Sequence, residues 1–186
     1  GRARAWAVLA VLAAFAIYTP ARIVLERDAL RVRHYRLGPG AATAGAGFRI
    51  VFVGDLQQDR HTDGARAAQV VGLVNAAGAD LVLAGGDWIN AGPDHIALAA
   101  ASAGALRSRL GTFSVVGDHE HFAYVDRARS VREVEAALAG HGVALVRDQV
   151  RWFTHGDRRI GVLFLEHNYL SRTDDATLDA GVAALA

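Results

Sequence analysis

Three short apolar segments of this 186-residue chain each end in the same dipeptide, Gly-Asp. The segments are VFVGD, LAGGD and SVVGD, and their aspartates, Asp55, Asp87 and Asp118, lie 32 and 31 residues apart. That interval fits a helix between two parallel strands, as in a βαβ unit. Because the carboxyl ends of parallel strands share one edge of a sheet, we expect the three carboxylates to converge there.

Helical patterns separate the three strands. Thr62 or Asp63 is the predicted cap of the first helix, and the capping box from Ser130 to Glu133 opens the third, which ends at Gly140. This alternation predicts the α/β class. The predicted strands cover residues 48–53, 81–84 and 113–116, and the predicted helices cover residues 65–77, 96–110 and 130–139.

Further elements are predicted at both ends of this core. An edge strand is predicted at 30–37 and a loop at 38–47, whose glycines do not form a dinucleotide fingerprint because Pro39 interrupts them and a strand follows. Strands are also predicted at 143–146, 150–153 and 160–165, with a turn at Gly156-Asp157 that favours an antiparallel pair. A final helix is predicted from Thr173 to Ala186, with acidic residues in its first turn.

The N-terminal segment is apolar and begins with arginines. Arg2 and Arg4 precede an uncharged run at 5–17 that continues to Pro20, which is short for a membrane span of about 20 residues. Three interpretations remain open: a transmembrane helix whose start lies upstream of Gly1, a signal-peptide core, or a buried helix. We expect residues 1–28 to be a membrane anchor, and the two arginines predict that residues 29–186 lie on the extracytoplasmic side.

Composition excludes several classes of function. The formal net charge of +1 indicates no nucleic-acid partner, although all 20 basic residues are arginines. The absence of cysteine excludes disulfides, thiolate zinc sites and cysteine nucleophiles. No P-loop and no Gly-x-Ser-x-Gly elbow is present. Any metal must therefore be bound through oxygen or imidazole.

Converging aspartates point to a bound cation. Carboxylates at one edge repel one another unless a cation lies among them or some of them are protonated. A cluster of divalent metal ions is the simplest resolution. The glycine before each aspartate is expected to allow a sharp turn and to leave room for a ligand to approach.

At these positions the chain resembles the calcineurin-like metallophosphoesterases. The family pattern is Asp-x-His, then Gly-Asp, then Gly-Asn-His-Asp/Glu, and later Gly-His-x-His. The corresponding residues here are Asp55-Leu56-Gln57, Gly86-Asp87 and Gly117-Asp118-His119-Glu120. The resemblance covers residues 48–186, and the preceding RIVLERDALRVRHYRL is similar to the membrane-anchored members. It implies part of an αββα sandwich, preceded by the apolar helix.

The resemblance also implies roles for individual residues. Asp55 would bind the first metal ion, Asp87 would bridge two ions, and Asp118 would bind the second. His119 would lie beside the phosphate and assist or orient the leaving group, and Glu120 would support the histidine loop. The implied cofactors are two divalent ions, Mn, Fe, Zn or Mg, which lower the pKa of the attacking water and neutralise the transition state.

Three departures from the family pattern affect the metal site. Gln57 stands in place of a histidine, and its amide oxygen is a weaker ligand, for which Asp59 is a candidate replacement. Asp118 replaces an asparagine, which favours harder cations but opposes an incoming phosphate. The Gly-His-x-His element is absent, and we expect it beyond Ala186. His167 is not included among the metal ligands.

Two functions are therefore kept as hypotheses. The first is a membrane-associated phosphomonoesterase or phosphodiesterase acting on a small-molecule or lipid phosphoester. The second is a catalytically inactive relative that uses the acidic pocket for binding or regulation, which Gln57 and Asp118 favour. His121 and Asn90 are candidate supporting residues beside the site.

Overall fold

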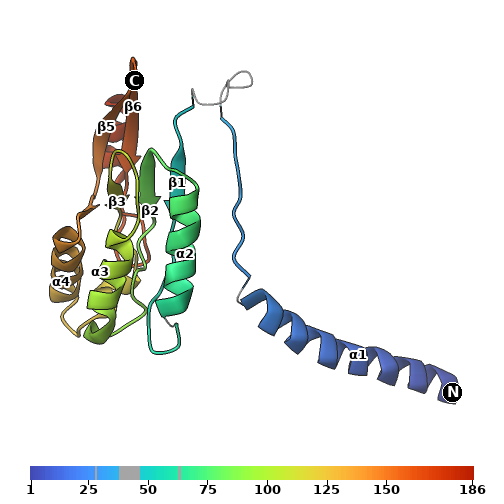
Figure 1. Cartoon of the computed structure of the whole chain (residues 1–186). Coiled ribbons are helices and arrows are strands. Elements are labelled where there is room, and N and C mark those ends of the chain that lie inside the picture. Colours follow the sequence, from blue (N-terminus) through green and yellow to red (C-terminus); the bar gives the residue numbers. More distant parts are fainter. Residues whose placement is uncertain (28, 38–46, 63) are drawn as a thin grey trace. The chain divides into compact units, whose positions relative to one another are not determined.

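The computed structural model describes residues 1–27, 29–37, 47–62 and 64–186 (Figure 1). It forms two compact units, Gly1–Gly38 and Pro39–Ala186, and each is described by itself. Most of the predicted loop at 38–47 and the predicted cap residue Asp63 lie outside the described residues.

The first unit contains one long helix, α1 (Arg2–Arg27). Its 26 residues measure about 39 Å at the α-helical rise, compared with roughly 30 Å for the hydrocarbon core of a bilayer. Its most apolar window of 18 residues has a mean hydropathy of 2.0. The helix is thus longer than the predicted apolar run, and it is long and apolar enough to span a membrane, a property that signal sequences share.

Arginines lie at both ends of α1. Arg2 and Arg4 begin the helix, and Arg22 pairs with Glu26 in its last turns. This distribution favours neither orientation, so an extracytoplasmic domain stays a prediction. Residues 29–37 follow without regular secondary structure and are mostly exposed. The strand predicted at 30–37 is therefore wrong, because a β-ladder needs a partner strand and the described part of this unit contains none.

The second unit is built on a parallel sheet of four strands. Its order is β1-β2-β3-β4, the same as the order along the chain, and every neighbouring pair is parallel. The mixed α/β class with a parallel sheet is confirmed. The strands are β1 (Ile50–Val53), β2 (Leu81–Ala84), β3 (Thr112–Ser114) and β4 (Val143–Leu145).

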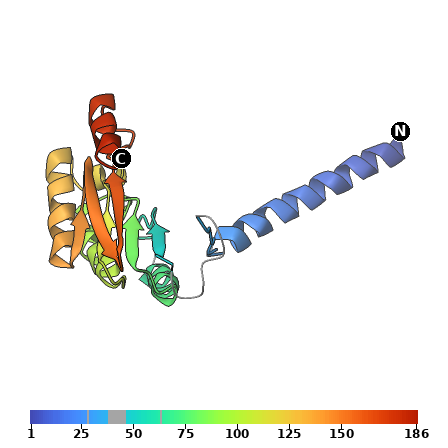
Figure 2. The same cartoon turned by 90° about the horizontal axis from the view of Figure 1, so that it is seen from above.

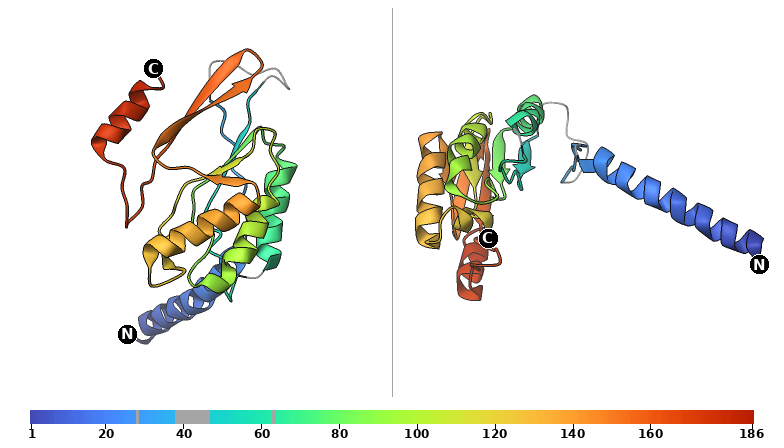
Figure 3. Two further views of the ribbon diagram at one scale, coloured as in Figure 1. Left: turned by 90° about the vertical axis from the view of Figure 1, so that its left-hand side faces the viewer. Right: turned by 90° about the horizontal axis from the view of Figure 1, so that it is seen from below.

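Helices connect these strands. In the structure α3 (Ile96–Gly104) packs between α2 (Gly64–Ala76) and α4 (Arg127–Gly140). Two short 3₁₀ helices lie in the loops at the carboxyl ends of β2 and β3, η1 (Pro93–His95) and η2 (His119–Phe122). Figures 2 and 3 show α2, α3 and α4 along one side of the strands.

An antiparallel hairpin and a last helix lie on the other side (Figures 2 and 3). The hairpin joins β5 (Gln149–His155) to β6 (Arg158–Phe164) through the predicted turn, and α5 (Asp175–Ala183) follows. The ring of Phe113 on β3 contacts the rings of Phe153 and Phe164, with centroids 5.1 and 5.9 Å apart. The hairpin thus covers part of the face of the sheet opposite α3.

The core lies between the sheet and its helices. Trp88 and Ile89, which directly follow the second Gly-Asp, are fully buried in it together with Val82 and Leu138. The indole Nε1 of Trp88 donates to Ser114 Oγ at 2.9 Å, which satisfies the polar atom of this large side chain. The segment after β2 is therefore anchored in the core.

Several helix boundaries differ from the prediction. The helix predicted at 96–110 ends at Gly104, because Leu106 turns into the core and Ser108 closes a separate turn with the backbone of Gly111. The helix predicted to start at Ser130 starts at Arg127, where the side chain of Asp126 caps the amide of Arg129. The predicted capping box is wrong.

Two side-chain contacts explain the outcome at the start of α4. The hydroxyl of Ser130 is buried and bonds to the backbone of Tyr124, while Glu133 accepts from the hydroxyl of Tyr124. Both side chains thus bind the preceding loop, not the helix amides.

The last helix ends at Ala183 and does not extend to Ala186. Its predicted acidic first turn includes Asp174, whose side chain caps the amide of Thr177.

Candidate functional site

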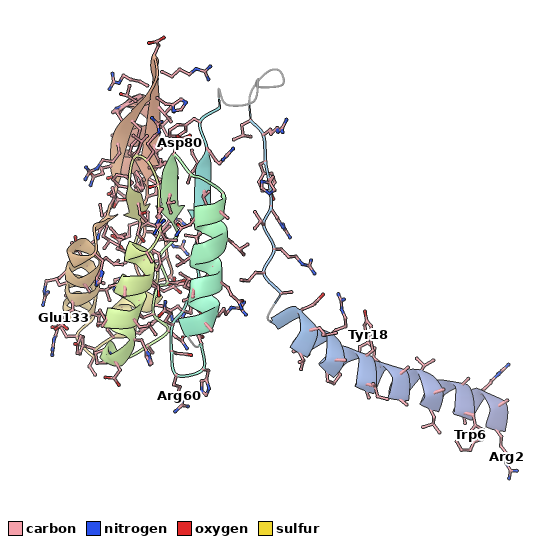
Figure 4. The ribbon with its side chains drawn as sticks, in the orientation of Figure 1. Arg2, Trp6, Tyr18, Arg60, Asp80 and Glu133 are labelled. Atoms are coloured by element: carbon pink, nitrogen blue, oxygen red, sulfur yellow. The ribbon has the colours of Figure 1, made fainter. Side chains whose placement is uncertain are left out.

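The three aspartates follow three adjacent parallel strands, as predicted. The loops are joined by backbone hydrogen bonds: the amide of Asp55 donates to Gly86 O at 3.4 Å, and the amide of Gln57 donates to Asp87 O at 2.8 Å. In Figure 4 the labelled residues mark the two ends of the sheet, with Asp80 just before β2 and Arg60 in the loop after β1. The aspartates lie at the end near Arg60.

The middle carboxylate, that of Asp87, has a pKa that is raised by its surroundings. Partial burial raises the pKa of Asp87, and the negative charges of Asp118 and Asp55 raise it further. A hydrogen bond from the amide of His119 to Asp87 Oδ1, at 2.9 Å, acts in the opposite direction. The middle carboxylate therefore lies in a place that favours a proton or a cation.

The outer two carboxylates are free to turn. Within the described residues, neither the Asp55 carboxylate nor the Asp118 carboxylate accepts a hydrogen bond. In the same part of the chain, no group of three or more histidine, aspartate or glutamate side chains is arranged to hold a metal ion. The donors at this edge, carboxylate and amide oxygens, suit a hard divalent cation, but their side chains are not assembled around a common point.

Strained backbone is concentrated at this edge. Four described residues other than glycine have positive φ, and three of them belong to the site: Asp55 at 55°, Gln57 at 40° and Asp87 at 57°. Aspartate tolerates this region, whereas glutamine rarely adopts it. Such conformations persist when surrounding contacts hold them, and they cluster at functional sites.

The glycines before the aspartates do not all act as predicted. Gly86, with φ of 82°, makes the expected sharp turn, but a Cβ there would lie 2.3 Å from Gly117 N. A Cβ at Gly117 would lie 2.2 Å from Asp87 Oδ1. The space beside these two glycines is thus filled by the neighbouring loop, and not by a ligand. At Gly54 the nearest atom would be 3.5 Å away, and Asp55 takes the positive φ instead.

Glu120 joins the loops that follow β2 and β3. Its carboxylate is fully buried and accepts three backbone N–H bonds: from Trp88 at 2.7 Å, from Asp87 at 2.8 Å and from Gly117 at 2.7 Å. Burial raises the pKa of Glu120, while the three amides favour the ionised form. The expectation that Glu120 supports the histidine loop is extended, because it also fixes the backbone of Asp87.

His119 lies between two of these elements. Its amide binds Asp87, and its ring Nδ1 lies 2.6 Å from the carbonyl oxygen of Asn90. A carbonyl only accepts, so Nδ1 carries the hydrogen and the neutral ring has its lone pair at Nε2. The ring also packs edge-on against Phe122, with centroids 5.8 Å apart. The histidine is thus oriented by its neighbours.

Asp59 is held within its own loop. Its Oδ1 accepts from the amides of His61 and Thr62, at 2.7 and 2.8 Å, and its Oδ2 accepts from Asn90 Nδ2 at 2.7 Å. These bonds, the one from Asn90 above all, lower the pKa of Asp59. Asp59 and Asn90 therefore connect the loop after β1 to the loop after β2, and both carboxylate oxygens of the candidate replacement ligand already have partners.

Two further polar side chains are buried near the edge. His121 is partly buried, which lowers its pKa, and its Nε2 has no hydrogen-bond partner within the described residues. Gln58 is fully buried, and neither atom of its amide has a partner there. Gln58 was not predicted to be a site residue, because a single polar residue after a strand is common in loops. His167, left out of the metal ligands, is exposed.

Comparisons with protein-family models, with curated proteins and with solved structures found no match to this chain. The residues of the site therefore carry the functional argument.

Proposed function

We propose that this chain is a metal-dependent phosphoester hydrolase of the calcineurin-like kind, with its site at the carboxyl ends of β1, β2 and β3. The observation that carries the proposal is the placement of Asp55, Asp87 and Asp118 directly after three adjacent parallel strands, at one edge of the sheet. Three carboxylates at one edge, two of them on residues with positive φ, favour a divalent cation between them.

The arrangement of helices and strands in layers supports the proposal. Helices cover one face of the parallel sheet, while the β5–β6 hairpin and α5 lie on the opposite side. We infer that the hairpin belongs to the second sheet and α5 to the outer helix layer of a partial αββα sandwich. The helix α1 would then hold the domain at a membrane, with a small-molecule or lipid phosphoester as substrate.

The aspartates and Gln57 would bind the metal ions. Asp87 lies between its two neighbours and is the candidate bridge, with Oδ1 bonded to the amide of His119 and Oδ2 free of described hydrogen bonds. Asp55 and Asp118 would turn toward it. When bound, the two ions would activate water and neutralise charge on the phosphoryl oxygens.

His119 would assist the leaving group by transferring a proton to it. The bond from Nδ1 to Asn90 O leaves Nε2 as the atom that exchanges protons with bound substrate. Glu120 would keep His119 and Asp87 at a fixed separation, because it holds the backbone on both sides of them. Positioning of this kind supplies much of the catalysis in phosphoryl transfer.

One observation favours the inactive relative as a second candidate. In the described part of the chain the metal ligands are not assembled, and Gln57 holds a strained position where the family pattern has a histidine. An acidic pocket of this kind would bind a cation or a cationic group without hydrolysis.

Metal content and hydrolysis separate the two candidates. The full chain, purified without chelator, is expected to contain about two divalent ions per molecule and to hydrolyse p-nitrophenyl phosphate or its bis ester in Mn²⁺. Asp87→Asn should lose both ions and lower the rate by at least about 100-fold. Asp157→Asn, in the exposed hairpin turn, is the matched control and should change neither. Metal without turnover would favour the binding function, and an unchanged metal content in Asp87→Asn would overturn the site.

The Asp87→Asn variant is expected to remain folded. Because the pKa of Asp87 is raised in the folded protein, the stability linked to this group is present at low pH and is lost as the pH rises through the folded pKa. A neutral asparagine removes that loss. In chelator at pH 8, the variant should therefore unfold at a temperature no lower than the wild type, as circular dichroism would show.

A further inference from the structure

A cavity lies next to the loops that carry the aspartates. It has a volume of about 250 Å³, and neither Asp55, Asp87 nor Asp118 lines it. Its walls come from the loop after β1 and from the segment that leads through η1 into α3. Figure 4 shows Arg60 at the outer end of the first of these loops. The lining residues are Asp59, Arg60, His61, Asn90, Ala91 and His95.

Hydrogen-bond donors dominate the walls of this cavity. Arg60 uses only its Nε, which donates to His61 Nε2 at 2.9 Å, so its two terminal nitrogens have no partner within the described residues. The ring of His95 likewise has none in that part of the chain. His95 is also the residue before α3, and no side chain caps that helix start. A guanidinium with both terminal groups free matches a phosphate or carboxylate in shape and charge.

The one acidic residue in the wall does not cancel this preference. Both oxygens of Asp59 accept hydrogen bonds, two from backbone amides of its own loop and one from Asn90. These bonds hold the carboxylate in the loop. They leave the guanidinium of Arg60 unpaired with Asp59, because no ion pair joins the two residues in the described part of the chain.

Asn90 connects the cavity to the proposed reaction site. Its side chain donates to Asp59 in the cavity wall at 2.7 Å, and its carbonyl oxygen accepts from the ring of His119 at 2.6 Å. A group bound in the cavity would therefore lie on the far side of Asn90 from the histidine. That arrangement suits a substrate with two anionic groups, one at the aspartates and one in the cavity.

The geometry points to an anion-binding subsite in this cavity, in which Arg60 and His95 bind a phosphate or carboxylate group. Its role as the place for a second anionic group of the substrate rests on the proposed phosphoester hydrolysis. The binding itself does not, because Asp55, Asp87 and Asp118 do not line the cavity and no metal is required.

Inorganic phosphate tests the subsite without metal or turnover. The full chain, with ¹⁵N-labelled histidine in detergent micelles and excess chelator, is titrated with phosphate while the imidazole resonances are followed. Saturable shifts of His61 and His95 are expected. Arg60→Gln should weaken the dissociation constant by about tenfold or more, as loss of one charge-assisted contact predicts. Arg151→Gln, on exposed β5, is the matched control and should leave it unchanged.

Separate outcomes distinguish this subsite from the hydrolase. Asp87→Asn in chelator should bind phosphate as the wild type does, even though it loses the metal. If the wild type shows no hydrolysis but phosphate binding depends on Arg60, the subsite stands and the hydrolase falls. Absence of saturable shifts at His61 and His95, or equal dissociation constants in Arg60→Gln and Arg151→Gln, would overturn the subsite.

Discussion

The loop after β2 is joined to the loop after β3 through a buried side chain, and to the loop after β1 through backbone hydrogen bonds. Glu120 accepts hydrogen bonds from three amides in the loops after β2 and β3. The backbones of these two loops are in direct contact at Gly86 and Gly117. The loop after β1 instead combines two strained residues, Asp55 and Gln57, with a buried amide that has no described partner. Two of the three carboxylates thus belong to loops that share the buried Glu120, and the third belongs to a loop to which Glu120 makes no described hydrogen bond.

Removal of the Glu120 carboxylate is expected to have the largest effect. Glu120→Ala leaves three buried amides without an acceptor, which should lower the free energy of unfolding by about 3 kcal/mol or more. Urea unfolding can be followed by Trp88 fluorescence after the exposed Trp6 and Trp152 are replaced by phenylalanine. Asp157→Ala serves as the control on an exposed carboxylate. A variant that unfolds at the wild-type urea midpoint would show that the two loops do not depend on this side chain.

A methyl group added to each glycine compares the loops directly. Gly117→Ala should cost about 2 kcal/mol, because its Cβ would overlap the carboxylate of Asp87. Gly54→Ala places its Cβ at ordinary contact distance and should cost less than about 1 kcal/mol. The same urea measurement applies to both. Equal losses in the two variants would show that the tight contact at Gly117 carries no extra cost.

Gln58→Leu should stabilise the protein. The buried amide of Gln58 has no described partner, and an unsatisfied buried polar group costs about 1–3 kcal/mol. A leucine of similar size removes that cost, so a gain of about 1 kcal/mol is expected. Gln149→Leu, at an exposed position of β5, is the control and should change stability little. A loss of stability in Gln58→Leu would mean that a bound water or ligand satisfies the amide.

The sheet could be predicted from the sequence because the signals that mark each strand and its end are local. An apolar run that ends in Gly-Asp marks a strand and its end, and the intervals between Asp55, Asp87 and Asp118 leave room for a helix each time. Parallel pairing and the shared edge follow from those two facts. The role of Glu120 was predicted only in outline, because its partners at Asp87 and Trp88 lie 33 and 32 residues away along the chain.

Tertiary contacts decided the features that local pattern missed. Ser130 matches a helix cap in sequence, but its hydroxyl binds the preceding loop in the folded protein. The alternating residues at 30–37 match a strand, yet the described part of their unit has no strand to pair with. The orientation of the carboxylates around a metal also depends on rotations of Asp55 and Asp118 that no sequence interval specifies.

The order of the sheet has a consequence for how the chain can acquire a new ligand. The strands follow one another from β1 to β4 without a reversal, and right-handed crossovers then place α2, α3 and α4 on a single face. Sheets that wind in both directions open a crevice where the direction changes, and ligands bind there. Among the described strands the direction does not reverse, so the loops at the edge are the elements that would select a ligand there. Exchanging one loop would therefore alter specificity and leave the sheet intact.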